Sequence, residues 1–462
     1  MARGFPLIGT GLAREGNPNQ LTMDVVVPTA IAPIPSRTRG TQLALALLCM
    51  LAISSPQYVW TLLTKPFAAG LGVSLPELQV TFSLLVVVQT FLSPLQGWLI
   101  ERLGVRLLLS LGGLLTGLSW ILASQANTLV MLYLSYGVLG GLGTGTIYVG
   151  AIGLVTRWFP ERRGLAAGIA AAGYGMGAIA TTFPITASLS SQGLAATLAW
   201  YGLGIGVVAV AAAQGLRLPD RDQSALLAQG LAARRAQGTE PAARPSVRPG
   251  RMLRTPVFWL MFLMMTLMST SGLMVISQMA SFTRDFGLAS TLVFGLAALP
   301  LALTLDRVTN GLTRPFFGWL SDRLGREQTM ALAFGFEALA MALWLLTRDN
   351  AAVFVVMSGV VFFGWGEIFS LFPATLIDTF GEDHATVNYG FLYMSQGLGS
   401  ILGGPLAALL HQVTGSWMPV FGVVIACDLL TAVLALLVLR PWRQRLMGTA
   451  QPTSLNPDRS AA

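Results

Sequence analysis

Long apolar runs are the feature that most constrains how this chain folds. An α-helix needs about 20 apolar residues to cross the hydrocarbon core of a bilayer, and the sequence contains twelve such runs. They are too long for barrel strands and do not alternate with a period of two, so they predict helices. The runs cover roughly residues 42–63, 79–100, 107–124, 129–156, 164–189, 195–216, 255–280, 289–318, 328–347, 351–374, 386–410 and 416–439.

The composition agrees with a lipid-embedded chain. Of the 462 residues, 54% are hydrophobic and 10% are charged, whereas soluble domains carry about 25% charged residues. A soluble fold of this length could not hide so much apolar surface. We therefore predict an all-α membrane protein in which twelve transmembrane helices account for most of the chain.

The positive charges follow the predicted topology. If both termini are cytoplasmic, the inside segments hold 23 of the 28 lysines and arginines, and the outside loops hold Lys65, Arg284 and Arg348. This positive-inside bias predicts a multi-pass protein of a bacterial-type inner (plasma) membrane with cytoplasmic N- and C-termini. The net charge of +8 is thereby explained by topology and anionic lipid, with no nucleic-acid partner. We expect a monomer in the bilayer.

Other classes of function lack their sequence signals. The two cysteines, Cys49 and Cys427, lie in apolar runs and predict neither a disulfide framework nor a metal site. No glycine-rich phosphate loop is present, so nothing favours ATP-driven chemistry or another cofactor. His384 and His411 lie near span ends without a nucleophile–base pairing, which argues against an enzyme. Residues 1–40 lack the apolar core of a signal peptide, so the first span is expected to act as an uncleaved targeting signal.

An internal repeat divides the chain into halves. Residues 97–104 (GWLIERLG) and 318–325 (GWLSDRLG) share six of eight positions at an offset of 221 residues. Two parallel six-span halves are the arrangement seen in the major facilitator superfamily. We therefore predict two pseudo-symmetric six-helix bundles. The expected parts are a cytoplasmic segment 1–40, a first bundle 41–216, a cytoplasmic linker 217–254, a second bundle 255–439 and a cytoplasmic tail 440–462.

The repeated loop also predicts a gate. Its glycines permit a tight turn, and its acid lies where a helix N-terminus or nearby arginines can hold it. We interpret Glu101, Arg102, Asp322 and Arg323 as parts of a latch on the cytoplasmic face. The alternative is a plain positive-inside loop, which two copies in register make less attractive.

Ionisable residues at membrane depth are costly and mark candidate sites. Arg314 lies well inside the eighth run, about 12 Å along the helix from Asp322. Pro315 follows it and should kink the helix. A guanidinium there offers a planar fork suited to a carboxylate, so we predict a substrate-binding role. The alternative is a structural arginine paired with an acid of another helix.

Further charges surround Arg314 in the sequence. Arg307 is seven residues earlier and projects from nearly the same helix face, with Asn310 between them. It would be a second cation or, as we favour, part of a neutralised cluster with Asp306 and Glu367. Glu367 has three possible roles, as a proton carrier, as a gate residue or as an ion-pair partner of Arg307, and we favour the ion pair. Glu337 and Asp428 are left unassigned.

Several stretches resemble the oxalate/formate antiporters of the major facilitator superfamily from about residue 42 to 440. The match is specific for the family and less so for the substrate. It rests on QYVWTL (57–62), RWFP (157–160), RRGLA (162–166), AAGYG (171–175), MLRTP (252–256), FW (258–259), NGLTRP (310–315), WG (365–366), LFP (371–373) and NYGF (388–391).

The resemblance implies two six-helix bundles with one central site and alternating access. The family's central arginine corresponds to Arg314, and its cavity aromatics to Tyr58, Tyr148, Tyr174 and Trp365. A further family tyrosine is Phe369 here. The family's lysine in the eleventh span is replaced by Gln396, so one half of a two-cation grip is missing. Asn310 stands where related monocarboxylate transporters carry an aspartate used in proton coupling.

The function implied is transport of small carboxylates, with exchange of oxalate for formate as the leading case. The alternative is a proton-coupled symporter of a monocarboxylate such as lactate, pyruvate or formate. A transporter-like receptor usually carries a long soluble signalling domain, and the 38-residue linker offers none. Drug efflux stays open, since the fold alone does not specify a substrate.

Overall fold

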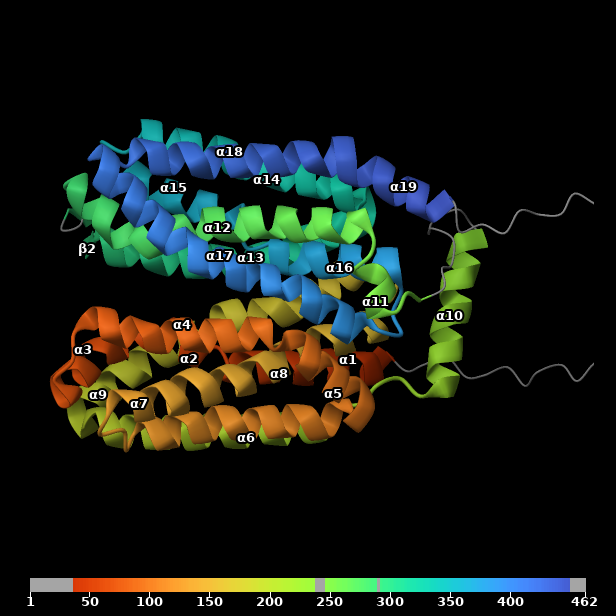
Figure 1. Cartoon of the computed structure of the whole chain (residues 1–462), viewed down its shortest axis with the longest axis horizontal. Coiled ribbons are helices and arrows are strands. Elements are labelled where there is room, and N and C mark those ends of the chain that lie inside the picture. The colour runs from red at the N-terminus through yellow and green to blue at the C-terminus, as the bar shows by residue number, and fades with distance from the viewer. Residues whose placement is uncertain (1–35, 237–245, 289–290, 449–462) are drawn as a thin grey trace, which may run out of the picture. The chain divides into compact units, whose positions relative to one another are not determined.

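The computed structural model describes residues 36–236, 246–288 and 291–448, and these are almost entirely helical (Figure 1). The first group of helices precedes residue 215 and contains ten segments. They are α1 (Ser36–Ala52), α2 (Ser55–Tyr58), α3 (Trp60–Leu71), α4 (Leu75–Phe91), α5 (Ser93–Leu103), α6 (Val105–Ala123), α7 (Leu129–Leu132), the π-helix η1 (Tyr133–Leu139), α8 (Gly140–Trp158) and α9 (Arg163–Gln214).

The remaining elements begin with α10 and α11 of the linker and continue through the second bundle. A two-stranded antiparallel hairpin, β1–β2, precedes α13. The elements are α10 (Arg221–Ala236), α11 (Pro249–Met252), α12 (Pro256–Asp285), β1 (Leu292–Val293), β2 (Leu296–Ala297), α13 (Ala298–Leu324), α14 (Arg326–Leu346), α15 (Ala351–Phe363), α16 (Ile368–Phe380), α17 (Ala385–Thr414), α18 (Met418–Leu434), the π-helix η2 (Ala435–Leu439) and α19 (Arg440–Gly448).

The predicted all-α membrane fold is confirmed. Eight helices of the described residues are long and apolar enough to cross a membrane, or nine if the pair α4–α5, bent by 50°, is one span. α9 runs through two predicted spans and turns at Gly193, whose φ of +79° favours glycine. α13 and α17 are also long helices, and α13 carries Asp306, Arg307 and Arg314. Each of the twelve apolar runs is therefore largely helical.

The repeated loops adopt the same backbone turn. Gly104 has φ 93° and ψ 148°, and Gly325 has φ 97° and ψ 156°. These conformations are readily available only to glycine, which explains why both copies of the repeat end in it. The sequence repeat thus corresponds to a repeat in structure, in which α5 is followed by α6 as α13 is followed by α14.

Glycines let the two groups of helices touch backbone to backbone. A Cβ atom on Gly168 of α9 would lie 2.9 Å from Cα of Pro315 on α13, and one on Gly97 of α5 would lie 2.7 Å from the carbonyl oxygen of Thr386 on α17. The pairs α9–α13 and α5–α17 are thus two seams between the bundles (Figure 1).

Several boundaries differ from the prediction. The run at 289–318 was expected to be helical throughout, but residues 292–297 form the hairpin and the helix continues to Leu324. The linker, for which no helix was predicted, contains α10, with an acid, Asp222, in its first turn. Most of the predicted segment 1–40 and the end of the tail 440–462 lie outside the described residues.

Candidate functional site

Arg314 is the most buried cation of the described chain and joins the two bundles. Its side chain is 0% exposed although it lies mid-helix in α13. Nη1 donates a 2.7 Å hydrogen bond to the backbone carbonyl of Ala171 on α9, and Nη2 donates a 2.8 Å bond to Oδ1 of Asn310. The guanidinium carbon lies 4.5 Å from the ring centroid of Phe369 on α16. Three helices therefore converge on this group.

The Arg314 charge has no anionic partner in the described structure. No carboxylate oxygen of the described residues forms a salt bridge with it. Its Nε has no hydrogen-bond acceptor. A buried charge is strongly unfavourable unless it is paired, and two neutral oxygens do not supply a counter-charge. The arrangement is therefore suited to a mobile anion.

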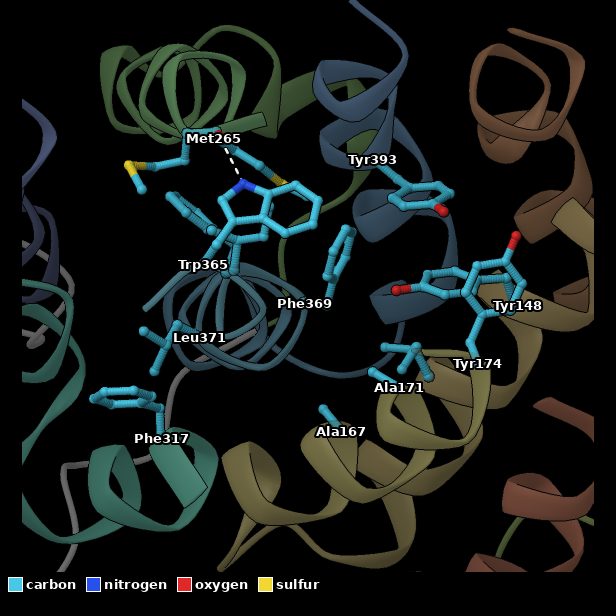
Figure 2. Close-up of a cluster of buried hydrophobic side chains, with 14 of the residues drawn as sticks. Tyr148, Ala167, Ala171, Tyr174, Met265, Phe317, Trp365, Phe369, Leu371 and Tyr393 are labelled. Carbon is cyan, nitrogen blue, oxygen red and sulfur yellow. Dashed lines mark hydrogen bonds between the residues drawn. The ribbon is translucent and has the colours of Figure 1, made fainter. Parts of the chain in front are cut away.

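Aromatic rings from both bundles gather around Tyr148 and Phe369 (Figure 2). Tyr148 of α8 stacks on Tyr393 of α17 with 4.7 Å between centroids. Tyr148 also meets Tyr174 of α9 edge to face at 5.1 Å and Phe369 at 6.4 Å. Across the boundary between the bundles, Tyr148 therefore stacks on one ring and meets another edge to face. The rings exclude water from the surroundings of the guanidinium, which strengthens any ion pair formed there.

Two glutamines that the sequence reading missed connect these tyrosines. Nε2 of Gln89 on α4 donates to the hydroxyl of Tyr174 at 3.2 Å and to that of Tyr393 at 3.0 Å. The Tyr174 hydroxyl in turn donates to Oε1 of Gln57. Gln89 is 1% exposed and follows the apolar stretch 84–88 in the middle of its run. A buried amide at membrane depth was the signal that could have identified it.

Arg307 and Tyr58 lie together at a second, less buried position. Nη1 of Arg307 donates to the backbone carbonyl of Tyr58 at 3.2 Å, and its guanidinium carbon lies 5.6 Å from the Tyr58 ring centroid. Tyr58 packs edge-on against Tyr174 at 5.5 Å. The favoured ion pair with Glu367 is not formed: neither Glu367 nor Asp306 makes a salt bridge to Arg307 within the described ranges. Arg307 is instead hydrogen-bonded to Tyr58 of the first bundle.

Trp365 and Gln396 occupy different kinds of position. Trp365 Nε1 donates to the backbone carbonyl of Met268 at 2.8 Å, the dashed line of Figure 2. The indole N–H is therefore not free to bind a substrate, and the residue contributes only the packing surface of its ring. Its ring meets Phe369 at 6.0 Å. Gln396 on α17 is 6% exposed, and its Oε1 has no hydrogen-bond donor. An unsatisfied buried amide oxygen is unfavourable, so Gln396 has capacity to bind a further donor.

One acid of the repeated loop caps a helix of the other bundle. Asp322, near the end of α13, accepts hydrogen bonds from the backbone N–H groups of Gly164 (3.0 Å) and Leu165 (2.9 Å) at the start of α9. A carboxylate is favoured there by the free N–H groups and the helix dipole. Arg326 Nη1 also donates to Asp322 at 2.6 Å. These bonds tie the bundles together at the end that carries α10 and α19, here called the α10–α19 end.

Arginines outside the repeated loop complete this closure. Arg163 of α9 pairs with Asp378 and Glu382 of the second bundle, each at 2.8 Å, and Arg326 pairs with Asp378 at 2.8 Å. Since α9 belongs to one bundle and the two acids to the other, these pairs exist only while this end is closed. Their joint effect is to stabilise the closed conformation.

The other copy of the loop makes a weaker closure. Glu101 pairs with Arg157 at 3.4 Å and with His384 at 3.5 Å. Arg157 also donates to the backbone carbonyl of Asp383 at 2.9 Å, which lies in the second bundle. The latch thus has two unequal halves, one at Asp322 and one at Glu101.

The loop arginines predicted as gate residues do not join the latch. Arg102 lies over the Trp98 ring at 4.4 Å, and Arg323 lies over the Trp319 ring at 4.2 Å. No carboxylate pairs with either in the part of the chain that the structure describes. They extend sideways over exposed indoles, a geometry that suits cation–π contact at a membrane boundary.

Comparison with known proteins identifies the family to which the chain is related. The family model for the Major Facilitator Superfamily matches residues 43–305 and 300–454. The oxalate:formate antiporter of Oxalobacter formigenes is 33% identical over 384 residues, covering 83% of this chain and 87% of that protein. Monocarboxylate transporter 13 of Rattus norvegicus is 26% identical, covering 73% and 74%.

Solved structures agree on the fold. The proton:xylose symporter XylE superimposes with a TM-score of 0.66 at 14% identity, covering 87% of this chain and 96% of that one. The transporter FucP, in its outward conformation, also gives a TM-score of 0.66 at 14% identity, covering 86% and 99%. At this identity the likeness concerns the fold alone.

Proposed function

The chain belongs to the major facilitator superfamily, and on that premise we propose that it is a secondary carrier of small carboxylates working by alternating access. Exchange of oxalate for formate is the leading case. The observation that carries this proposal is Arg314, a wholly buried guanidinium without a carboxylate partner in the described residues. The similarity to an oxalate:formate antiporter supports the same class of substrate. Arg314 binds the carboxylate with its planar fork.

The surrounding residues shape the site around that ion pair. Four aromatic side chains line the site, namely Tyr58, Tyr148, Tyr174 and Trp365. Asn310 accepts a hydrogen bond from the Arg314 guanidinium and orients it. The Nε2 amide of Gln396 donates a hydrogen bond to the second end of a longer substrate, and Arg307 offers a second cation at the more exposed position. Arg314 must release Ala171 or Asn310, or use its open Nε, to donate to both substrate oxygens. Where the anion takes the place of Ala171, its binding loosens a bond between the bundles.

The latch contacts bear on which side of the membrane the described conformation is closed to. We place the α10–α19 end in the cytoplasm of a bacterial-type inner membrane, in line with the positive-inside bias. With Glu101 and Asp322 engaged, this end is closed. Opening requires the loss of the inter-bundle ion pairs of Arg163 and the capping bonds of Asp322. The carrier functions as a monomer because one chain contains both bundles and the whole site.

Exchange follows from the charge of the empty site. Reorientation with an uncompensated Arg314 is unfavourable, whereas the site is neutral and can reorient when it holds formate, or when it holds oxalate with Arg307 supplying the second positive charge. Proteoliposomes loaded with unlabelled oxalate or formate test this by uptake of the labelled partner. Counterflow of either anion supports the proposal, and absence of counterflow for every mono- and dicarboxylate tested overturns it.

A proton-coupled monocarboxylate symporter is the second candidate. The observation that favours it is Gln396, a neutral residue where the resemblance implies a lysine for the second carboxylate. The similarity to a monocarboxylate transporter points the same way. Robust proton-linked lactate uptake without oxalate–formate counterflow would establish this candidate in place of the first.

A further inference from the structure

Three carboxyl groups are buried inside the second bundle and have no role in the proposed function. Glu337 lies on α14, Glu367 directly precedes α16, and Asp428 lies on α18. Their side chains are 1%, 0% and 0% exposed. Ionisable groups at membrane depth are rare because each is costly. Three in one bundle therefore require an explanation.

Most of their oxygens have no hydrogen-bond donor. Both carboxyl oxygens of Glu337 and both of Glu367 are unpartnered, as is Oδ2 of Asp428. Among the described residues, a side-chain donor comes from Ser271 of α12, whose hydroxyl donates to Asp428 Oδ1 at 2.8 Å. No lysine or arginine of the described residues forms a salt bridge with any of the three. Carboxylates without donors or cations are not stable in such an interior, so the group holds protons.

The three groups lie on helices that pack together. A Cβ atom on Gly364 would lie 2.7 Å from Cβ of Glu337, and Gly364 begins the break between α15 and α16 at which Glu367 lies. α14, which carries Glu337, packs on α18, which carries Asp428. Buried carboxyl groups on neighbouring helices disfavour one another's ionisation. The residues do not form a metal site, since no group of acids, histidines or cysteines in the described ranges has suitable geometry.

The same helix break connects this group with Arg314. A Cβ atom on Gly366 would lie 2.5 Å from the Asn310 carbonyl oxygen, so the break packs directly on α13. Phe369, the second residue of α16 and two residues after Glu367, has its ring centroid 4.5 Å from the Arg314 guanidinium carbon. A discontinuous helix at membrane depth is a common place for coupling sites.

The helices packed around the group carry other charges besides Arg314. α13 carries Asp306 and Arg307, about two turns before Arg314. The remaining ones are near helix ends: Arg284 and Asp285 on α12, Asp322 and Arg323 on α13, Arg326 and Glu327 on α14, and Asp378 on α16. Arg314 lies over Phe369, just after the helix break, and is therefore the cation to which the group is linked.

We propose that Glu337, Glu367 and Asp428 form a proton-binding site whose occupancy is linked to the anion on Arg314. When a carboxylate occupies Arg314, Glu367 is protonated. When the carboxylate leaves, the O–H bond of the Glu367 carboxyl breaks, the proton passes to water on the same side, and the remaining carboxylate compensates Arg314. Glu337 and Asp428 share the remaining protons. No other reactant is needed.

This inference rests on the proposed function and extends it. A carrier that can compensate Arg314 internally is able to reorient empty, so it performs proton-linked net transport as well as exchange. Exchange itself does not require the proton site, because the loaded carrier is already neutral. The two activities are therefore separable by substitution.

The test compares two assays in proteoliposomes containing the full chain. Counterflow of labelled formate at equal pH reports exchange, and accumulation of formate driven by a pH gradient reports proton-linked net transport. We expect the wild-type protein to perform both. Glu367→Gln should keep counterflow and lose pH-driven accumulation, with the same pattern, less complete, for Glu337→Gln and Asp428→Asn. Asp349→Asn, an exposed acid in the α14–α15 loop, should behave as wild type.

A second measurement does not depend on transport, so it also tests a variant that folds but no longer transports. Addition of formate to weakly buffered, detergent-solubilised protein should take up protons in the wild type and not in Glu367→Gln, as read by a pH-sensitive dye. Wild-type counterflow without pH-driven accumulation would overturn the inference alone. Equal accumulation or equal proton uptake by Glu367→Gln would also overturn it. Absence of wild-type counterflow would overturn the proposed function on which it rests.

Discussion

The guanidinium of Arg314 on α13 is bonded to the backbone carbonyl of Ala171 on α9 at 2.7 Å. The substrate-binding cation we propose is thus also a tie between the two bundles. A carboxylate that takes over this hydrogen bond both binds and loosens the contact between α9 and α13. Substrate binding and conformational change therefore share one group.

Arg314→Lys is expected to abolish most transport while the protein still inserts and folds. Lysine keeps the charge but loses the planar fork, and a charge-assisted hydrogen bond contributes about 1.5–3 kcal/mol. Loss of one such bond corresponds to about 10- to 150-fold weaker binding. Counterflow measured against formate concentration gives the affinity. Near-normal counterflow would remove Arg314 from the site.

The matched control for that change is Arg284→Lys. Arg284 lies in the last turn of α12, is exposed, and bonds only to the backbone carbonyl of Ala280 through Nε in the described structure. Its transport should equal that of the wild type. An equal loss in both variants would point to a general need for arginine rather than to the Arg314 site.

Gly168→Ala is expected to prevent the bundles from closing along α9 and α13. The new methyl group would meet the Arg314 carbonyl and lie 2.9 Å from Cα of Pro315, and these backbone atoms cannot turn aside. Such overpacking costs about 1–3 kcal/mol. Lower Tm and slower counterflow should follow. Gly204→Ala, on the same helix with nothing within 4 Å, is the control, and equal effects in both would exclude the contact as the cause.

The helices and the central arginine of the site can be predicted from the sequence because each is encoded by a short stretch of neighbouring residues. Apolar runs report membrane helices, and the GWLxxRLG repeat locates the two Gly turns at Gly104 and Gly325. Arg314 is conspicuous because a cation in an apolar run is costly. None of these inferences depends on knowing which helices are neighbours.

The partners of these residues depend on tertiary contacts and were not predictable in the same way. Asp322 was expected to lie at a helix N-terminus or beside nearby arginines, and it does both, but the sequence did not say that the helix is α9 of the other bundle or that the arginine is Arg326 and not Arg323. The proposed pair of Glu367 with Arg307 fails for the same reason. The break before α16 places Gly364 against Glu337, which no linear pattern reports.

Arg163→Gln is expected to destabilise the closed α10–α19 end. The substitution removes two inter-bundle ion pairs at 2.8 Å, and the Arg163 side chain is 11% exposed. A cost of about 1–3 kcal/mol lies between the values for exposed and buried pairs. Tm should fall, and the difference from wild type should shrink in high salt. The neighbouring Arg162→Gln, exposed in the same loop, should leave Tm unchanged; if it lowers Tm equally, the latch is not the cause.

Gln396→Lys is expected to shift the carrier toward dicarboxylates. Gln396 is 6% exposed with an unpartnered Oε1, and the resemblance implies a lysine there. A second cation would bind the far carboxylate of oxalate, and one charge-assisted bond contributes about 1.5–3 kcal/mol, or about 10- to 150-fold in affinity. Competition of oxalate against labelled formate measures the ratio. Gln396→Met removes the amide without adding charge and should gain no oxalate preference. If the lysine and methionine variants discriminate equally, Gln396 does not face the second carboxylate, and Arg307 becomes the residue to test.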